Sequence, residues 1–406
     1  MSFSCSSART DCSLGRVKYS SWLALDGEKM KLILAALTLV FSLLFLEGAG
    51  ILPAYSDENY WIIKTPMHVA RVAAGIAAVN ETIYVFGGSQ TLNVSNHYFS
   101  TTINATESYN LIIDTWTEKA SMPTSRSYFG TAVYQNRIYC IGGLVLSGNG
   151  IEKASTGINE VYDPSTDTWE TKTPMPTARY GFEANTVDDK IYVIGGWVQS
   201  ESIDEHVEKS PQVDIYDPLT DQWSFGKSMP TAVACYSSAV VDDRIYVISG
   251  ISIGSTITNI TQIYDPKMDE WFFGASIPMG VKNAGAGAIA GNNLLKAIYV
   301  VGGSSASAPL NGQIVNQVYF VEADSWGSAE PMPLDKSGLR VAVVNNTLFA
   351  VGGGHNIFTP SSTTNMQYMP LAMTPEPFPE ILFVVVITLI VVCVGLGLLV
   401  YLIKRK

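Results

Sequence analysis

Short apolar runs recur along the middle of the chain, and each ends in a pair of glycines. They include IYVFGG, IYCIGG, IYVIGG and IYVVGG, and the glycine pairs begin at positions 87, 142, 195, 302 and 352, with Ser249-Gly250 in the remaining place. Runs that are apolar on both faces are typical of strands buried between stacked sheets. Because successive pairs are 50–55 residues apart, the pattern predicts a repeated structural unit.

A second, more polar pattern follows each glycine pair. A tyrosine precedes a tryptophan by seven positions, and an aspartate stands two positions before the tryptophan. The tyrosine–tryptophan pairs are Tyr109/Trp116, Tyr162/Trp169, Tyr216/Trp223, Tyr264/Trp271 and Tyr319/Trp326. Turn sequences such as DPSTD separate the two aromatic positions, since proline fixes φ and aspartate binds its own backbone. Each unit is therefore predicted to hold four short strands.

The two patterns together resemble the kelch repeat, in which Gly-Gly and a spaced Tyr/Trp pair mark each blade of a β-propeller. The resemblance covers residues 57–370 and implies an all-β fold, a six-bladed kelch-type β-propeller of four-stranded blades. Trp61 stands in a tryptophan-type strand with no strands before it, whereas the last unit has no tryptophan strand of its own. We therefore expect the N-terminal strand to become the outer strand of the last blade and to close the ring.

The segments outside the repeats predict a membrane location. Residues 381–403 are uncharged and mostly Val, Leu and Ile, long enough for a transmembrane helix. The basic residues 404–406 then predict a cytoplasmic tail. We expect a single-pass protein of the cell membrane with its propeller outside the cytoplasm. The other predicted segments are a polar N-terminal extension that is a candidate mis-assigned start (1–29), a signal peptide or N-terminal anchor (30–56) and a proline-rich stalk (371–380).

Charge argues against one class of partner, and the cysteine content argues against a disulfide. The formal net charge of −11 argues against nucleic acid, which demands a basic surface. The repeat region has two cysteines, Cys140 and Cys235, in different units, so free buried thiols are expected rather than a disulfide. Five N-x-Ser/Thr triplets fall in predicted turns or loops and are candidates for glycosylation. They begin at Asn80, Asn93, Asn104, Asn259 and Asn345.

Basic residues recur sixteen positions before the glycine pairs, which makes them candidates for an anionic ligand. A ring of such groups would suit a carboxylate, a sulfate or an acidic peptide. The alternative is a structural role, in which each base pairs with a carboxylate. Four positions further on, Glu183 and Arg340 are the charged exceptions among small residues. The ligand-binding candidates are Arg71, Arg126, Arg179, Lys282, Lys336, Glu183 and Arg340, with Val233 in the fourth unit.

Long, irregular loops are expected on one face of the propeller, between the second and third strands of each blade. Long loops on a rigid scaffold are where binding usually occurs. Aromatic residues in these loops could contact a partner, although each could instead pack against its own blade. The partner-contact candidates are Tyr98, Phe99, Trp197 and Phe358.

Three functions remain open. The first is a cell-surface module that binds a protein or a glycan through the long-loop face. The second is an extracytoplasmic sugar epimerase or mutarotase, because a six-bladed propeller also resembles the N-acetylneuraminate epimerases, with Glu183 and an arginine as the acting groups. The third is a structural surface-layer component. No cofactor or metal is expected, since the four histidines, His68, His97, His206 and His355, lack ligand spacing.

Overall fold

The structure is a computed structural model, and it describes residues 59–94, 97–146, 153–199, 207–290, 295–355 and 360–370. The chain divides into two compact units, Met1–Ser56 and Asp57–Lys406. All described residues belong to the second unit.

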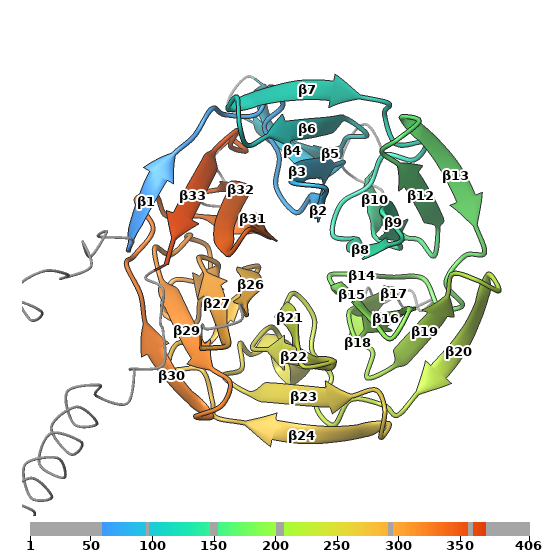
Figure 1. Ribbon diagram of the computed structural model, residues 1–406, viewed down its shortest axis with the longest axis vertical. Helices are drawn as coiled ribbons and strands as arrows, with labels where there is room; N and C mark the ends of the chain where they lie inside the picture. Colours follow the sequence, from blue (N-terminus) through green and yellow to red (C-terminus); the bar gives the residue numbers. More distant parts are fainter. Residues whose placement is uncertain are drawn as a thin grey trace, which may run out of the picture. The chain divides into compact units, whose positions relative to one another are not determined.

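In the described ranges, six four-stranded antiparallel sheets surround a central axis (Figure 1). In the strand orders that follow, each sheet is given from its innermost to its outermost strand. Sheets 1 to 3 are β2 (Gly75–Val79), β3 (Thr82–Phe86), β6 (Thr106–Asn110), β7 (Thr115–Lys119); β8 (Gly130–Tyr134), β9 (Arg137–Ile141), β12 (Asn159–Asp163), β13 (Thr168–Lys172); and β15 (Ala184–Val187), β16 (Lys190–Ile194), β19 (Val213–Asp217), β20 (Gln222–Gly226). Sheets 4 to 6 are β21 (Ser237–Val241), β22 (Arg244–Ile248), β23 (Thr261–Asp265), β24 (Glu270–Gly274); β26 (Gly285–Ile289), β27 (Ala297–Val301), β29 (Asn316–Phe320), β30 (Ser325–Ser328); and β31 (Ser337–Val344), β32 (Thr347–Gly354), β33 (Asn365–Met369), β1 (Tyr60–Ile63). The predicted all-β, propeller-like fold is confirmed.

Short extra strands occupy segments that the sequence had indicated as irregular loops. In several sheets, antiparallel pairing continues past the glycine pair. These elements are β4 (Ser89–Val94) with β5 (His97–Thr102), β10 (Leu144–Leu146) with β11 (Lys153–Ser155), β14 (Arg179–Tyr180) with β17 (Trp197–Gln199) and β18 (Val207–Lys209), and β25 (Val281–Lys282) with β28 (Ser304–Ser305), together with the 3-10 turn η1 (Ile253–Ser255). The prediction of irregular loops is therefore wrong for β4, β5, β10, β11, β17, β18 and β28, whereas β14 and β25 lie outside the predicted loops.

The ring is closed by strands from the two ends of the repeat region. β1 pairs antiparallel with β33, with Trp61 opposite Tyr368. The two rings pack with centroids 4.9 Å apart, and the Tyr–Trp pairs of the other sheets have centroids 4.9–5.2 Å apart. The hydroxyl of Tyr368 donates to Asn59, which stands two positions before Trp61 where the other sheets have aspartate. The repeat motif of sheet 6 is thus completed by residues more than 300 positions apart, as the sequence predicts.

The Tyr–Asp–Trp motif clamps each sheet to the one before it. In sheet 2, Tyr162 donates a 2.6 Å hydrogen bond to Asp167, which also accepts the backbone N–H of Ala120 from the end of sheet 1. The indole of Trp169 donates to the carbonyl of Ala120 at 2.8 Å. Aspartate and tryptophan therefore satisfy both backbone groups of one residue. The corresponding clamped residues are Thr65, Thr173, Lys227 and Ala275.

The hydrophobic core lies between neighbouring sheets. The second strands are almost wholly buried, and their side chains pack against the aromatic residues of the next sheet. Phe86 of sheet 1, for example, meets the edge of Trp169 of sheet 2 at 5.5 Å and that of Tyr162 at the same distance. This aromatic packing explains why the motif is repeated in every unit.

The predicted single-pass location at the membrane is contradicted. Within the ranges that the structure describes, no helix is long and apolar enough to cross a membrane. The segments predicted at 1–29, 30–56, 371–380, 381–403 and 404–406 themselves lie outside the described residues.

Candidate binding site at the mouth of the central channel

The inner strands β2, β8, β15, β21, β26 and β31 surround the central axis (Figure 1), and each contributes residues to a cavity there. Just before each of them, or at the start of the strand in β31, one residue has a positive φ of 51–70°. It hydrogen-bonds through its backbone to its counterpart in the next sheet, at 2.7–2.9 Å. Six such bonds make a closed circle, which we call the collar. Its residues are Ala73, Tyr128, Gly181, Cys235, Asn283 and Gly338.

A second circle of backbone hydrogen bonds lies beside the collar. It shows that Lys282 does not occupy the basic position of sheet 5, contrary to the prediction from the sequence. The second residue of each glycine pair donates to the residue two positions before the collar of the next sheet. In sheet 5 that acceptor is Val281, which is buried, and not Lys282. The insertion in the first hairpin of this unit had shifted the alignment by one residue. The basic position therefore holds arginine in sheets 1 to 3, valine in sheets 4 and 5, and Lys336 in sheet 6.

The three arginines at this position are wholly buried and neutralised. Arg126 pairs with Glu160, and its other terminal nitrogen donates to the carbonyl of Cys140 at 2.8 Å. Each arginine reaches the third strand of its own sheet, so the charge stays inside the blade. The equivalent ion pairs are Arg71 with Glu107 and Arg179 with Asp214. This geometry is that of the structural alternative, and these side chains are closed to a ligand on the face.

Sheets 4 and 5, which have valine at the basic position, carry an uncharged glutamine in place of the ion pair. Where sheet 2 has Glu160, sheet 4 has Gln262, whose amide accepts from Thr231 N–H at 2.9 Å and donates to its carbonyl at 3.0 Å. Gln317 does the same with Met279 in sheet 5. An amide satisfies both backbone groups by itself, whereas a buried carboxylate also requires a cation. Arginine therefore accompanies the carboxylates, and valine accompanies the glutamines.

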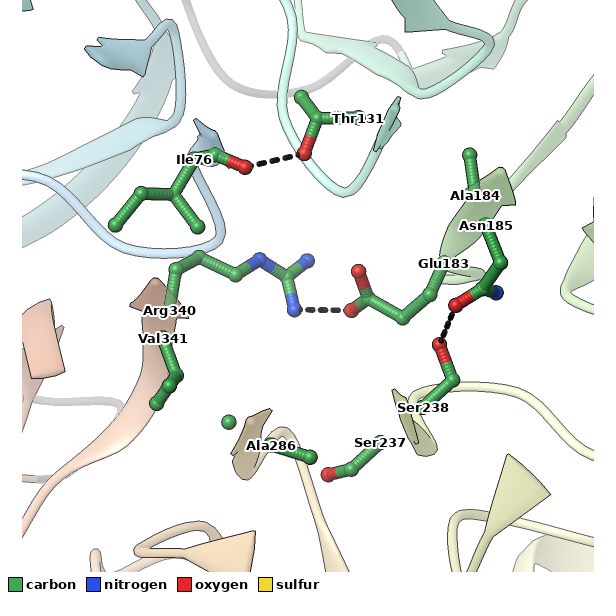
Figure 2. A pocket seen from close by; sticks show the side chains of 11 residues that line it. Ile76, Thr131, Glu183, Ala184, Asn185, Ser237, Ser238, Ala286, Arg340 and Val341 are labelled. Carbon is green, nitrogen blue, oxygen red and sulfur yellow. Dashed lines mark hydrogen bonds and ion pairs between the residues drawn. The ribbon is translucent and has the colours of Figure 1, made fainter. Parts of the chain in front are cut away.

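Glu183 and Arg340 meet across the channel. Arg340 extends from β31 and Glu183 from the residue before β15, on opposite sides of the ring, and their closest atoms are 2.6 Å apart (Figure 2). The Arg340 Nε also donates to the carbonyl of Ala74 at 2.8 Å. Burial raises the pKa of Glu183, and the guanidinium of Arg340 opposes that rise. The structure thus brings together two candidates that lie 157 positions apart in the sequence.

A polar cavity of about 150 Å³ adjoins this ion pair. Figure 2 shows Thr131, Asn185 and Ser238 among the residues around it. Several of their hydroxyls are already bonded to the protein, as in the 2.7 Å bond from Thr131 to the carbonyl of Ile76 and the 3.0 Å bond from Ser238 to Asn185. Beside the cavity, Oε2 of Glu183, Nη2 of Arg340 and Nδ2 of Asn185 have no hydrogen-bond partner in the described part of the chain.

Two tyrosines and a thiol stand at the collar: Tyr128 and Cys235 are members of it, and Tyr180 precedes Gly181. Tyr128 and Tyr180 meet edge to face with centroids 6.4 Å apart. Burial is the main cause that raises the pKa of each to about 12, and Cys235 contributes to both. Burial raises the pKa of the Cys235 thiol. Smaller influences on this pKa come from Trp197, Arg340, Lys282 and Glu183. Side chains from sheets 2 to 6 therefore converge on one mouth.

The predicted partner-contact aromatics are only partly described. Trp197 is half-buried beneath the amine of Lys209, which lies 4.3 Å from the centre of its ring. A Cβ on Gly181 would lie 3.0 Å from the Trp197 ring and 3.2 Å from the Cys235 sulfur, so this tryptophan packs over the collar. Tyr98 and Phe99 belong to β5, but their side chains, like residue Phe358, lie outside what the structure describes.

The glycosylation candidates lie in exposed turns and loops where their side chains are described. Asn80, Asn104, Asn259 and Asn345 are exposed, but the amide of Asn104 donates to the Met122 carbonyl and that of Asn345 to Glu81. The side chain of Asn93 is outside the described part. Glycosylation of these residues stays a prediction.

The carboxylates that pair with the three buried arginines were not predicted from the sequence. Glu107, Glu160 and Asp214 were not singled out, although each stands two positions before the motif tyrosine, where the valine sheets have glutamine. Comparing that position between units would have found the ion pairs. The collar carries no such signal, because its residue types differ from sheet to sheet. Across the described ranges, no group of three or more His, Cys, Asp or Glu side chains could hold a metal ion.

Comparisons with known proteins give the following matches. The family model of the Attractin/LZTR1 beta-propeller matches residues 144–373, and that of the Kelch motif matches residues 70–123. The chain is 30% identical over 304 residues to the Kelch-like protein terF of Aspergillus terreus, covering 74% of this chain and 63% of that protein. It is 25% identical over 219 residues to Beta-scruin of Limulus polyphemus, covering 53% of this chain and 23% of that protein. The chain thus spans less than two thirds of either relative.

Among solved structures, the chain resembles one titled "Structure of YjhT". The TM-score is 0.61 with 17% sequence identity, and the match covers 74% of this chain and 95% of the other. At that identity the likeness concerns the fold.

Proposed function

The chain belongs to the kelch-repeat β-propeller family, and from that premise we propose that it is a binding module for a protein partner. We propose further that its six four-stranded sheets are the complete set of blades. The surface that we assign to the partner is the set of extra strands β4–β5, β10–β11 and β14–β17–β18, here called the hairpin row.

The observation that carries this proposal is the cross-linking of the hairpin row. Thr102 of β5 exchanges two 3.3 Å hydrogen bonds with the backbone of Leu146 in β10. The backbone N–H of Ser155 in β11 donates to Gln199 of β17 at 3.1 Å. Because neighbouring hairpins hold one another, they form a continuous surface over three sheets, which suits the area of about 800 Å² per partner that a stable protein interface needs.

Proximity labelling with the full chain in its native cells tests this assignment. One variant replaces residues 144–155 with a short Asn-Gly turn, which removes the middle hairpin but leaves sheet 2 intact. The control, Lys267→Ala, changes the opposite, turn-bearing face, where Lys267 pairs with Asp243. We expect a set of proteins captured by the wild type and the control and absent from the hairpin variant. Capture of the same set by all three would contradict the hairpin row as the binding surface.

A second candidate function, a sugar epimerase, is favoured by one observation, the Glu183–Arg340 pair beside a polar cavity. A carboxyl whose pKa is raised by burial is suited to exchange a proton near neutral pH, and a guanidinium can hold an oxyanion. Proton exchange from sugar carbon atoms into deuterated water, followed by NMR, tests it. Glu183→Gln should abolish any such exchange.

A further inference from the structure

We infer that the chain forms a symmetric dimer in which β24 of one copy pairs antiparallel with β24 of a second copy. The inference goes beyond the proposed function and does not rest on it, because β24 belongs to sheet 4 and the hairpin row to sheets 1 to 3. Two features of the described residues carry it: an exposed aromatic strand at the rim of the ring, and a sequence in that strand that is complementary to itself.

The first feature is the free edge of β24. Figure 1 shows this strand on the rim of the ring, and within the described ranges it pairs with β23 alone. Phe272 and Phe273 are consecutive and therefore lie on opposite faces of the strand, where they are 42% and 60% exposed. An edge strand with unpaired backbone groups and large apolar side chains is a template for another strand.

The outer strands of sheets 1 and 2 are protected by charges that β24 lacks. Charged side chains within an edge strand discourage its pairing with another chain. In β7 and β13 these residues are Glu118, Lys119, Glu170 and Lys172. The only charged residue of β24 is Glu270, which stands first in the strand and pairs with Lys227 of the neighbouring sheet. The exposed centre of β24 therefore has no electrostatic protection.

The remaining outer strands are also uncharged, but their centres are less exposed or less apolar. Where β24 has Phe272, β20 has Ser224 and β30 has Gly327. In β1 the exposed residues, Tyr60 and Ile63, stand at the two ends, and the central residues are half-buried. Among the described outer strands, β24 thus has the exposed aromatic centre.

The second feature is the order of residues in β24, Glu-Trp-Phe-Phe-Gly. Antiparallel pairing of two copies about Phe272 puts Trp271 opposite Phe273 and puts Phe272 opposite its own counterpart. Aromatic pairs across two strands are favourable, and Glu270 falls opposite Gly274, so no like charges oppose each other. A contact between identical strands is the isologous arrangement of a two-fold dimer.

The charge of the whole chain also favours this strand as the contact between copies. Each copy carries a formal net charge of −11, so two copies repel each other unless they meet where the charges are balanced. At β24 the carboxylate of Glu270 is balanced by Lys227. Because a contact centred on one strand is small, we expect a dissociation constant in the micromolar range.

Sedimentation equilibrium of the full chain over a dilution series tests the inference. Phe272→Glu copies sheet 2, where β13 has Glu170 at this position, and it puts two like charges opposite each other at the two-fold axis. We expect a monomer–dimer equilibrium for the wild type and a dissociation constant at least about tenfold higher for Phe272→Glu. The control Ser224→Glu places the same charge at the same position of β20 and should leave the dissociation constant unchanged.

A charge exchange separates a lost contact from a lost fold. Phe272→Lys should also be monomeric by itself, because two lysines then meet at the axis. An equal mixture of Phe272→Glu and Phe272→Lys should form a mixed dimer, since opposite charges face each other. A wild type that stays monomeric throughout the series, or a Phe272→Glu variant that dimerises as tightly as the wild type, would overturn the inference. A mixture that stays monomeric would overturn it as well.

Discussion

At the scale of single residues, burial decides what each charge can do. Three arginines that the sequence offers as ligand-binding candidates are enclosed with carboxylates, whereas Lys282, one position away from the repeated site, has no ion pair among the described residues. The chain also contains its own comparison. Arg126 with Glu160 and Val233 with Gln262 occupy the same two positions in different sheets, so both solutions are compatible with the same backbone.

This internal comparison predicts a rescue. Arg126→Val alone should lower the free energy of unfolding by about 3–5 kcal/mol, because it leaves the carboxylate of Glu160 buried without its cation. Arg126→Val/Glu160→Gln, which copies sheet 4, should recover most of that loss. Urea denaturation of the wild type, both single variants and the double variant measures the coupling. A double variant no more stable than Arg126→Val would refute this explanation.

At the scale of elements, the outer strand β1 depends on a partner from the far end of the repeat region. Trp61 packs on Tyr368, and its indole donates to the carbonyl of Glu330 at 2.9 Å. The strand therefore contributes both a ladder of hydrogen bonds and the clamp onto sheet 5, as the internal fourth strands do for their neighbours.

Removal of the indole should open the ring. Trp61→Ala is expected to cost about 2–4 kcal/mol, somewhat less than a fully buried tryptophan, because Trp61 is half-buried. Ile63→Ala on the same strand is the control, since that side chain is 57% exposed and should change stability little. Thermal unfolding followed by circular dichroism compares them. An unchanged melting temperature for Trp61→Ala would contradict the role of Trp61 in closing the ring.

At the scale of the whole molecule, the clamps make the ring sensitive to acid. Burial raises the pKa of Asp114, Asp167 and Asp221, but hydrogen bonds from a tyrosine hydroxyl and a backbone N–H outweigh it, and the net pKa of each is lowered. A carboxyl with a lowered pKa in the folded state adds stability above its unfolded pKa of about 3.9, and that stability is lost as the pH falls through the folded value.

We therefore expect the free energy of unfolding to fall steeply below about pH 4. Asp167→Asn should reduce stability at pH 7 and flatten the decline, since one titrating clamp is gone. Asn59 already occupies this position in sheet 6, so the asparagine fits the geometry. Urea denaturation between pH 2.5 and 7 measures both effects. An identical pH dependence for the variant and the wild type would exclude Asp167 as a contributor.

The sequence by itself determined the repeat, the four strands of each unit, the all-β propeller and the strand that closes it. Local period and turn chemistry suffice for these features, because each unit repeats the same contacts with its neighbour. Glu183 and Arg340 were also visible as exceptions at one repeated position, although their meeting across the channel was not.

Only the tertiary structure decided which charges are free. The pairing of Arg126 with Glu160 depends on burial, the exclusion of Lys282 from the repeated site depends on a one-residue register, and the collar consists of backbone bonds between residues of unrelated types. The convergence of Tyr128, Lys282 and Arg340 on one mouth arises because the ring brings three sheets together at its axis. Sequence period reports what every unit shares, whereas a binding site is built from the positions at which the units differ.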